Sequence, residues 1–181
     1  DYAHLNSFKE AKKFSNVGIL FIKTDNKYVG GATLQKIGNT IVNRMLGVID
    51  GDTILFEKSV IAAIYYYIIK FAKEKKFKRI DFGYTNPILS DGILLYKNKW
   101  GGRIEYEPWD KIIFLLKICR LNESLKRLLM DNPLITVNNN KLGAYIFSET
   151  ELPITKIKGT NIPITLDYFK GLEFIKVATC K

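Results

Sequence analysis

Near the start of the chain, mainly apolar segments are separated by short polar ones. Three stretches carry the β-branched and aromatic residues typical of strands: 17–23 (VGILFIK), 28–36 (YVGGATLQK) and 41–49 (IVNRMLGVI). The pairs 25–26 (DN) and 38–39 (GN) between them favour the tight turns of β-hairpins. Strands joined by such short turns pair antiparallel, so the pattern predicts a three-stranded meander. The 30–31 pair (GG) predicts a bulge in its second strand.

After residue 51 the spacing of apolar residues becomes that of a helix. Residues 55–75 predict one long helix, and its first half is apolar nearly all round, which indicates deep burial against a sheet. Asp52 or Thr53 can cap this helix. Residues 78–82 (KRIDF) then predict a short strand. Because a helix between two strands forms a right-handed crossover, we expect this strand to run parallel to the third one, beside it.

The remaining pattern extends the same order of elements. Ser90 can cap a helix over 91–100 (DGILLYKNKW), which ends at a glycine pair, and 103–107 (RIEYE) predicts a further strand. A short helix is expected at 6–14. From residue 17 the order is therefore β-β-β-α-β-α-β, an α/β (α+β) fold on one mixed sheet. A sheet that changes from antiparallel to parallel opens a cleft at that point, and the start of the crossover helix should face it.

The last part of the chain predicts an extension packed on this domain. Residues 111–130 form a basic amphipathic helical pattern, which either docks on an anionic membrane or partner or packs against the domain. Residues 134–137 and 142–147 predict a hairpin, followed by short strands or loops. We therefore divide the chain into a domain over 1–109 and an extension over 110–181.

Composition limits the class of protein. The chain has 181 residues, 47% of them apolar and 25% charged, as in ordinary globular proteins. It opens at Asp1 without a methionine, so we expect a piece of a longer protein that lacks N-terminal elements of the domain. The most apolar run, 60–69, is about half the roughly 20 residues of a membrane span. Two distant cysteines fit a reducing compartment, so we expect a soluble, cytoplasmic protein.

Charge and histidine content narrow the chemistry. The net charge is +10, which indicates an anionic partner or simply a lysine-rich composition. The basic residues are scattered, so no specific DNA binding is expected. His4 is the only histidine, which excludes Ser-His-Asp and Cys-His catalysis and the common zinc sites, and no metal is expected. Chemistry must use carboxylates, tyrosine, lysine, hydroxyls or backbone dipoles.

Two short motifs carry a resemblance to a known family. Residues 79–84 (RIDFGY) and 96–101 (YKNKWG), together with the order of elements over 6–109, resemble one branch of the GNAT acyltransferase superfamily. This is the acetyltransferase-like branch associated with polysaccharide and cell-envelope synthesis, to which the Fem-type aminoacyl transferases are related. The resemblance implies transfer of an acyl or aminoacyl group to an amine or hydroxyl of a polymer or envelope precursor, with acyl-CoA or aminoacyl-tRNA as the donor.

The sequence departs from the family at the donor-binding loop. Acetyl-CoA users carry a glycine-rich signature before the crossover helix, whereas residues 47–53 (GVIDGDT) hold two carboxylates that repel phosphate. The resemblance still assigns donor binding to Gly51, Asp52 and Thr53. This departure favours the Fem-type branch or an inactive site.

The residues predicted to act in catalysis or in binding the reactants are Asp81, Tyr96 and Lys97. Asp81 follows a parallel strand, where it either orients the attacking amine and takes its proton or caps the following loop. Tyr96 either protonates the leaving group or packs on the sheet. Lys97 either binds a phosphate or carboxylate or lies in solvent.

The other assignments concern substrate and partners. Tyr84 and Asp91 are placed at the substrate side, although Asp91 and Glu57 in first helical turns are explained by structure alone. An alternative function is a catalytically inactive GNAT-like module that binds a protein partner or an anionic membrane surface. An anionic membrane surface or tRNA is a possible partner, whereas nucleic-acid binding through charge alone is the weakest hypothesis, since the aromatic residues lie mainly in apolar runs.

Overall fold

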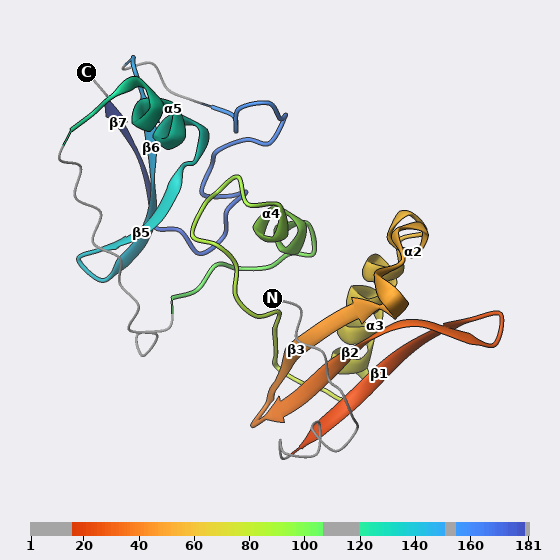
Figure 1. Ribbon diagram of the computed structural model, residues 1–181. Helices are drawn as coiled ribbons and strands as arrows, with labels where there is room; N and C mark the ends of the chain where they lie inside the picture. The colour runs from red at the N-terminus through yellow and green to blue at the C-terminus, as the bar shows by residue number, and fades with distance from the viewer. Residues whose placement is uncertain (1–15, 107–119, 151–154, 180–181) are drawn as a thin grey trace. The chain divides into compact units, whose positions relative to one another are not determined.

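The chain folds into two compact units, Asp1–Tyr84 and Thr85–Lys181. The computed structural model describes residues 16–106, 120–150 and 155–179 (Figure 1). The predicted helix at 6–14 therefore lies outside the described residues. In both units helices accompany a mixed sheet, so the predicted mixed α/β class is confirmed, with two sheets in place of one.

A four-stranded sheet in the order β1-β2-β3-β4 forms the first unit. Its strands are β1 (Val17–Thr24), β2 (Lys27–Ile37), β3 (Thr40–Val48) and β4 (Arg79–Asp81). The first three pair antiparallel, which confirms the predicted meander. Asp25 and Asn26 have positive φ angles of 46° and 62°, as a two-residue hairpin turn of type I′ requires.

The crossover to β4 is parallel, as the sequence predicts. Ile41 lies opposite Ile80 and Val42 opposite Asp81 in a parallel ladder. The meander and the stretch around Ile80 therefore belong to one sheet. The short β4 thus becomes the edge neighbour of β3 within the described part of the first unit.

The crossover segment does not form the single helix predicted over 55–75, so that prediction is wrong. A 3-10 turn (η1, Ile49–Gly51) leads into a short helix α2 (Thr53–Glu57), and the long helix α3 begins only at Val60 and ends at Glu74. Ser59, with φ of 61°, separates the two helices. Because this left-handed conformation cannot continue a helix, the chain changes direction there.

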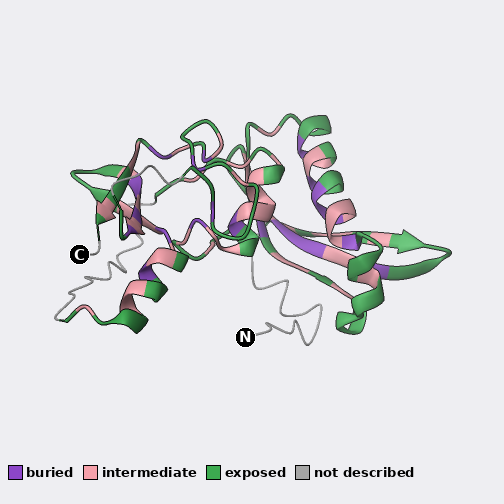
Figure 2. Ribbon diagram, turned by 90° about the horizontal axis from the view of Figure 1, so that it is seen from above, coloured by how far each residue is buried: buried purple, intermediate pink, exposed green. Residues whose placement is uncertain are grey.

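Helix α3 buries one face only. Ile64 and Ile68 are fully buried and pack with Ala32, Leu34 and Ile41 of the sheet. Tyr66 and Tyr67 on the other face are exposed. The predicted burial of this segment against a sheet is therefore confirmed for one face of α3, and buried and exposed residues alternate along the helix (Figure 2). Burying each large aliphatic side chain contributes about 1.5–3 kcal/mol, which makes this face the main source of stability in the unit.

Gly30 and Gly31 lie beside a bulge, as predicted, and also allow close backbone approach. The β1–β2 register shifts between Ile22 and Lys23, leaving Val29 without an opposite residue next to Gly30. A Cβ on Gly31 would lie 2.4 Å from the carbonyl oxygen of Leu20. Real Cβ atoms do not approach so closely, so the pairing of β1 with β2 requires glycine at this position.

The second unit contains a three-stranded sheet in the order β5-β6-β7. Its strands are β5 (Leu134–Asn138), β6 (Lys141–Ser148) and β7 (Phe174–Thr179). The predicted hairpin of β5 and β6 is confirmed, with Asn139 and Asn140 at φ of 49° and 59°. The sequence does not predict that β7 pairs parallel with β6.

Helix α4 (Gly92–Lys99) belongs to the second unit. Its Leu94 is buried in one cluster with Ala144 and Ile146 of β6. The division of the chain after Tyr84 thus places α4 with the residues that the sequence assigned to the extension. Asp91, and not Ser90, caps the helix, since its side chain accepts the N–H of Leu94 at 2.8 Å.

Of two further predictions for this unit, one is wrong over the described residues and the other is confirmed only in part. Residues 103–106 form no strand, although the N–H of Ile104 donates to the carbonyl of Lys170 at 2.8 Å. The helix predicted over 111–130 is described only as α5 (Glu123–Asp131), and 111–119 lie outside the described residues. Asn122 has extended backbone angles and accepts the N–H of Leu125 at 2.8 Å, which fixes the start of the helix there.

Helix α5 lies beside β6, and its Leu129 is buried (Figure 1). This contact favours packing over membrane docking as the role of the predicted amphipathic pattern. No helix in the described part of the chain is long and apolar enough to cross a bilayer.

Candidate functional site

The parallel ladder between β3 and β4 stops while β3 continues. The last pair is Val42 with Asp81, whereas β3 extends to Val48. We call this divergence the fork. Among the described residues no strand pairs with the β4 side of β3 beyond Val42. Gly83 lies against the carbonyl of Asn43, whereas the backbone groups of residues 44–48 on that side have no strand partner among the described residues.

Asn43 stands at the base of the fork. It follows the last paired residue of β3, is only 7% exposed, and lies opposite Leu34, whose side chain is in the core under α3. Its Oδ1 has no hydrogen-bond partner in the described part of the chain. Leaving such an oxygen buried and unsatisfied costs about 1–3 kcal/mol. Asn43 is not among the predicted site residues, and the signal for it in the sequence is one amide side chain in a mainly apolar strand.

Asp81 is the predicted catalytic residue nearest to the fork. Its Oδ1 accepts the backbone N–H of Gly83 at 2.7 Å, and Gly83 has φ of 77°. This is the loop-capping interaction that the sequence offered as an alternative role. The carboxylate thus holds the chain in a turn where it leaves the sheet.

The loop before the crossover has a different geometry from a phosphate cradle. Asp52 caps α2, and its Oδ1 accepts the N–H of Ile54 at 2.8 Å. Helix α2 has only five residues, and α3 begins after Ser59. Gly51, Asp52 and Thr53 therefore do not stand at the start of the long helix, and a carboxylate already occupies the cap. Their role in donor binding stays a prediction.

Glu57, which the sequence places in a first helical turn, is the last residue of α2. The prediction for its position is therefore wrong, because the helix is short and begins at Thr53. Tyr84, the last residue of the first unit, is 80% exposed, and its role in substrate binding stays a prediction.

The other predicted site residues lie on or beside α4 in the second unit. Asp91 accepts the N–H of Leu94 with one oxygen and the Asn86 side-chain amide with the other, both at 2.8 Å. Tyr96 is half-buried against Trp100, with ring centroids 6.4 Å apart. Lys97 is half-buried too. Structure thus explains Asp91 fully, while Tyr96 and Lys97 stay predictions.

The predicted residues are therefore divided between the two units. The first holds Asp81, Tyr84 and the 51–53 loop, and the second holds Asp91, Tyr96 and Lys97. Among the described residues no three His, Cys, Asp or Glu side chains gather as a metal site would require.

Comparison of the chain with protein-family models, curated proteins and solved structures finds no match. The resemblance to the GNAT superfamily is therefore carried by the two motifs and by the order of elements from β1 to α4 alone.

Proposed function

We propose that the first unit binds an acyl donor at the fork and transfers its acyl or aminoacyl group to an amine or hydroxyl of a polymer or envelope precursor. One observation supports this most: β3 and β4 are parallel neighbours whose ladder ends at Val42 and Asp81, while β3 runs on to Val48. The proposal uses residues of the first unit alone.

The fork offers a donor backbone hydrogen bonds. An extended arm that carries amide groups can lie along residues 44–48 as an added strand would. A backbone N–H on this edge can also stabilise the negative charge that develops on the attacked carbonyl oxygen. Histidine is not needed for either task.

The proposed transfer is a direct attack. The lone pair of the acceptor amine forms a bond to the acyl carbon, and the carbon–sulfur or carbon–oxygen bond to the donor breaks. The electron pair of that bond stays on the leaving sulfur or oxygen, and the proton lost by the amine ends there. Such a reaction is accelerated chiefly by positioning the two reactants.

Asn43 provides a neutral acceptor for this positioning. Its Oδ1 is buried and without a partner among the described residues, and a rotation of the side chain toward the fork would let it accept an N–H of the donor arm or of the attacking amine. The energetic cost of leaving this oxygen unsatisfied is removed when the ligand binds, which favours the bound state.

Replacing Asn43 by leucine separates a binding role from a structural one. Leucine has nearly the same shape and no polar atom, so we expect the free energy of unfolding to stay unchanged or rise by about 1 kcal/mol. Stabilisation by acyl-CoAs or aminoacyl-tRNA in a thermal-shift assay should disappear in Asn43→Leu. Thr33→Val on the neighbouring strand β2, a buried polar residue outside the fork, is the matched control and should keep it. A wild-type protein that neither donor class stabilises would contradict the proposal.

One observation favours the alternative function of a non-catalytic module. The carboxylates of Asp52, Asp81 and Asp91 all accept backbone N–H groups, so none of them is held ready as a base. Lys73, Lys75, Lys76 and Lys78 are exposed around the end of α3 and suit an anionic surface. Flotation with anionic vesicles, lost at high salt, would support this function.

A further inference from the structure

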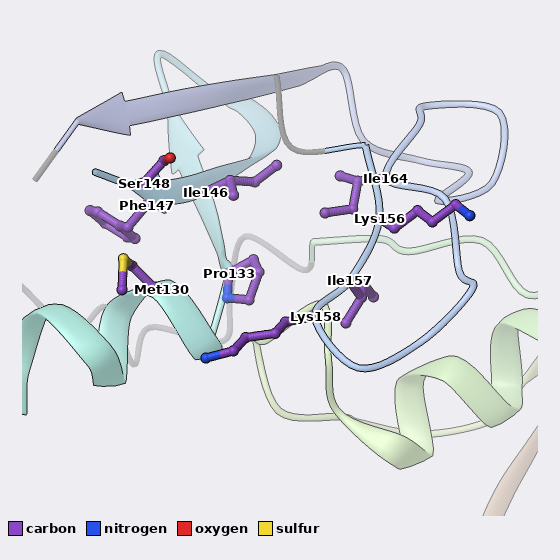
Figure 3. A pocket seen from close by; sticks show the side chains of 9 residues that line it. All are labelled: Met130, Pro133, Ile146, Phe147, Ser148, Lys156, Ile157, Lys158 and Ile164. Atoms are coloured by element: carbon purple, nitrogen blue, oxygen red, sulfur yellow. The ribbon is translucent and has the colours of Figure 1, made fainter. Parts of the chain in front are cut away.

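The second unit contains a hollow of about 350 Å³ (Figure 3). It lies between α5, β6 and the segment that starts at residue 155. Its lining consists of Met130, Pro133, Ile146, Phe147, Ser148, Lys156, Ile157, Lys158 and Ile164. This volume is within the range of small-molecule sites, which is about 300–1,000 Å³.

The walls of the hollow are apolar. Ile146 of β6 and the isoleucines Ile157 and Ile164 of the segment that starts at residue 155 are buried and line it. The one side-chain hydroxyl in the lining, Ser148, already accepts the N–H of Thr150 at 3.1 Å. The interior therefore suits a hydrocarbon group, which forms no hydrogen bonds.

The edge of the hollow carries positive charge. Lys156 and Lys158 are both exposed, and the Lys158 side chain runs along the edge beside Pro133 and Met130 (Figure 3). Its ammonium forms an ion pair with Asp131, the last residue of α5. Both members of this pair are largely in solvent, with 70% and 46% of their side chains exposed. Such pairs contribute about 0–1 kcal/mol, so an anionic ligand can replace Asp131 at little cost.

We propose that this hollow binds an amphipathic anion. The hydrocarbon part of the ligand fills the space between the three isoleucines, and its carboxylate or phosphate takes the place of Asp131 on Lys158. This site lies wholly in the second unit and does not depend on the acyl-transfer proposal for the first.

Titration calorimetry with the full chain tests the site. Octanoate and octyl phosphate supply the two anionic ends, and 1-octanol supplies the hydrocarbon alone. We expect at least one of the two anions to bind saturably and about tenfold more tightly than 1-octanol. Lys158→Gln should remove this preference. Lys141→Gln, at the opposite end of β6, is the matched control and should keep it.

A second variant is expected to bind the anion more tightly, and a damaged fold could not produce this result. Asp131→Asn releases Lys158 from its ion pair, so the affinity for the bound anion should increase several-fold while that for 1-octanol stays the same. The proposal is overturned if Asp131→Asn leaves the anion affinity unchanged, if 1-octanol binds as tightly as both anions, or if no probe binds saturably.

Discussion

Replacing Gly31 by alanine should unfold the four-stranded sheet of the first unit. The added Cβ would lie 2.4 Å from the carbonyl oxygen of Leu20 on β1, a backbone atom that cannot rotate away. Relief requires β1 and β2 to separate, and Gly31 pairs directly with Phe21. We expect a loss of about 3 kcal/mol or more in the free energy of unfolding. Hydrogen exchange of the backbone amides of β1 and β2 under native conditions measures this loss of stability.

The control for this variant lies in the neighbouring strand. Gly18 of β1 has no heavy atom within 4 Å of a built Cβ, so Gly18→Ala should change the stability by less than about 1 kcal/mol. Equal stabilities of the two alanine variants would mean that β1 and β2 do not approach as described.

A second large effect is expected at Gly171 in the second unit. Its φ of 103° is strained for any other residue, and an added Cβ would lie 2.0 Å from the carbonyl oxygen of Ile104. The neighbouring Phe169 and Leu172 are buried, so a displaced backbone also disturbs the core. Gly171→Ala should cost about 3 kcal/mol or more, measured by amide exchange of β6.

Gly92 provides the contrast within the same unit. It opens α4, has open space around a built Cβ, and alanine is the better helix former by about 1 kcal/mol. Gly92→Ala should therefore keep or raise the stability. If Gly171→Ala did the same, the path of residues 170–172 beside Ile104 would be wrong.

The parts of the fold that the sequence predicts correctly are those fixed by local signals. The 25–26 and 38–39 turns set the meander, and the 138–140 turn sets the second hairpin. The parallel position of β4 follows from the handedness of crossovers. In each case a short range of residues determines the geometry.

The errors occur where the geometry depends on distant contacts. The helical spacing of apolar residues over 55–75 does not show that Ser59 adopts a left-handed conformation, and the polar triplet 57–59 (EKS) fits the exposed face of a continuous helix equally well. Nothing local predicts that β7 joins β6, because the two strands are far apart in sequence. The packing of Leu94 beside Ala144, which places α4 in the second unit, is also a contact between distant parts of the chain.

The candidate site shows the same division. Local spacing predicted that Asp52 can cap a helix and Asp81 a turn, and the structure confirms both interactions. The buried, unsatisfied oxygen of Asn43 could not be predicted, since it depends on where the β3–β4 ladder ends and on the cover that α3 provides.

The fork as a donor site is tested most directly by amide exchange of residues 44–48 with and without donor. We predict that acyl-CoA or aminoacyl-tRNA slows exchange in this segment of wild-type protein and not in Asn43→Leu. Unchanged exchange of residues 44–48 in the presence of both donors would contradict the account.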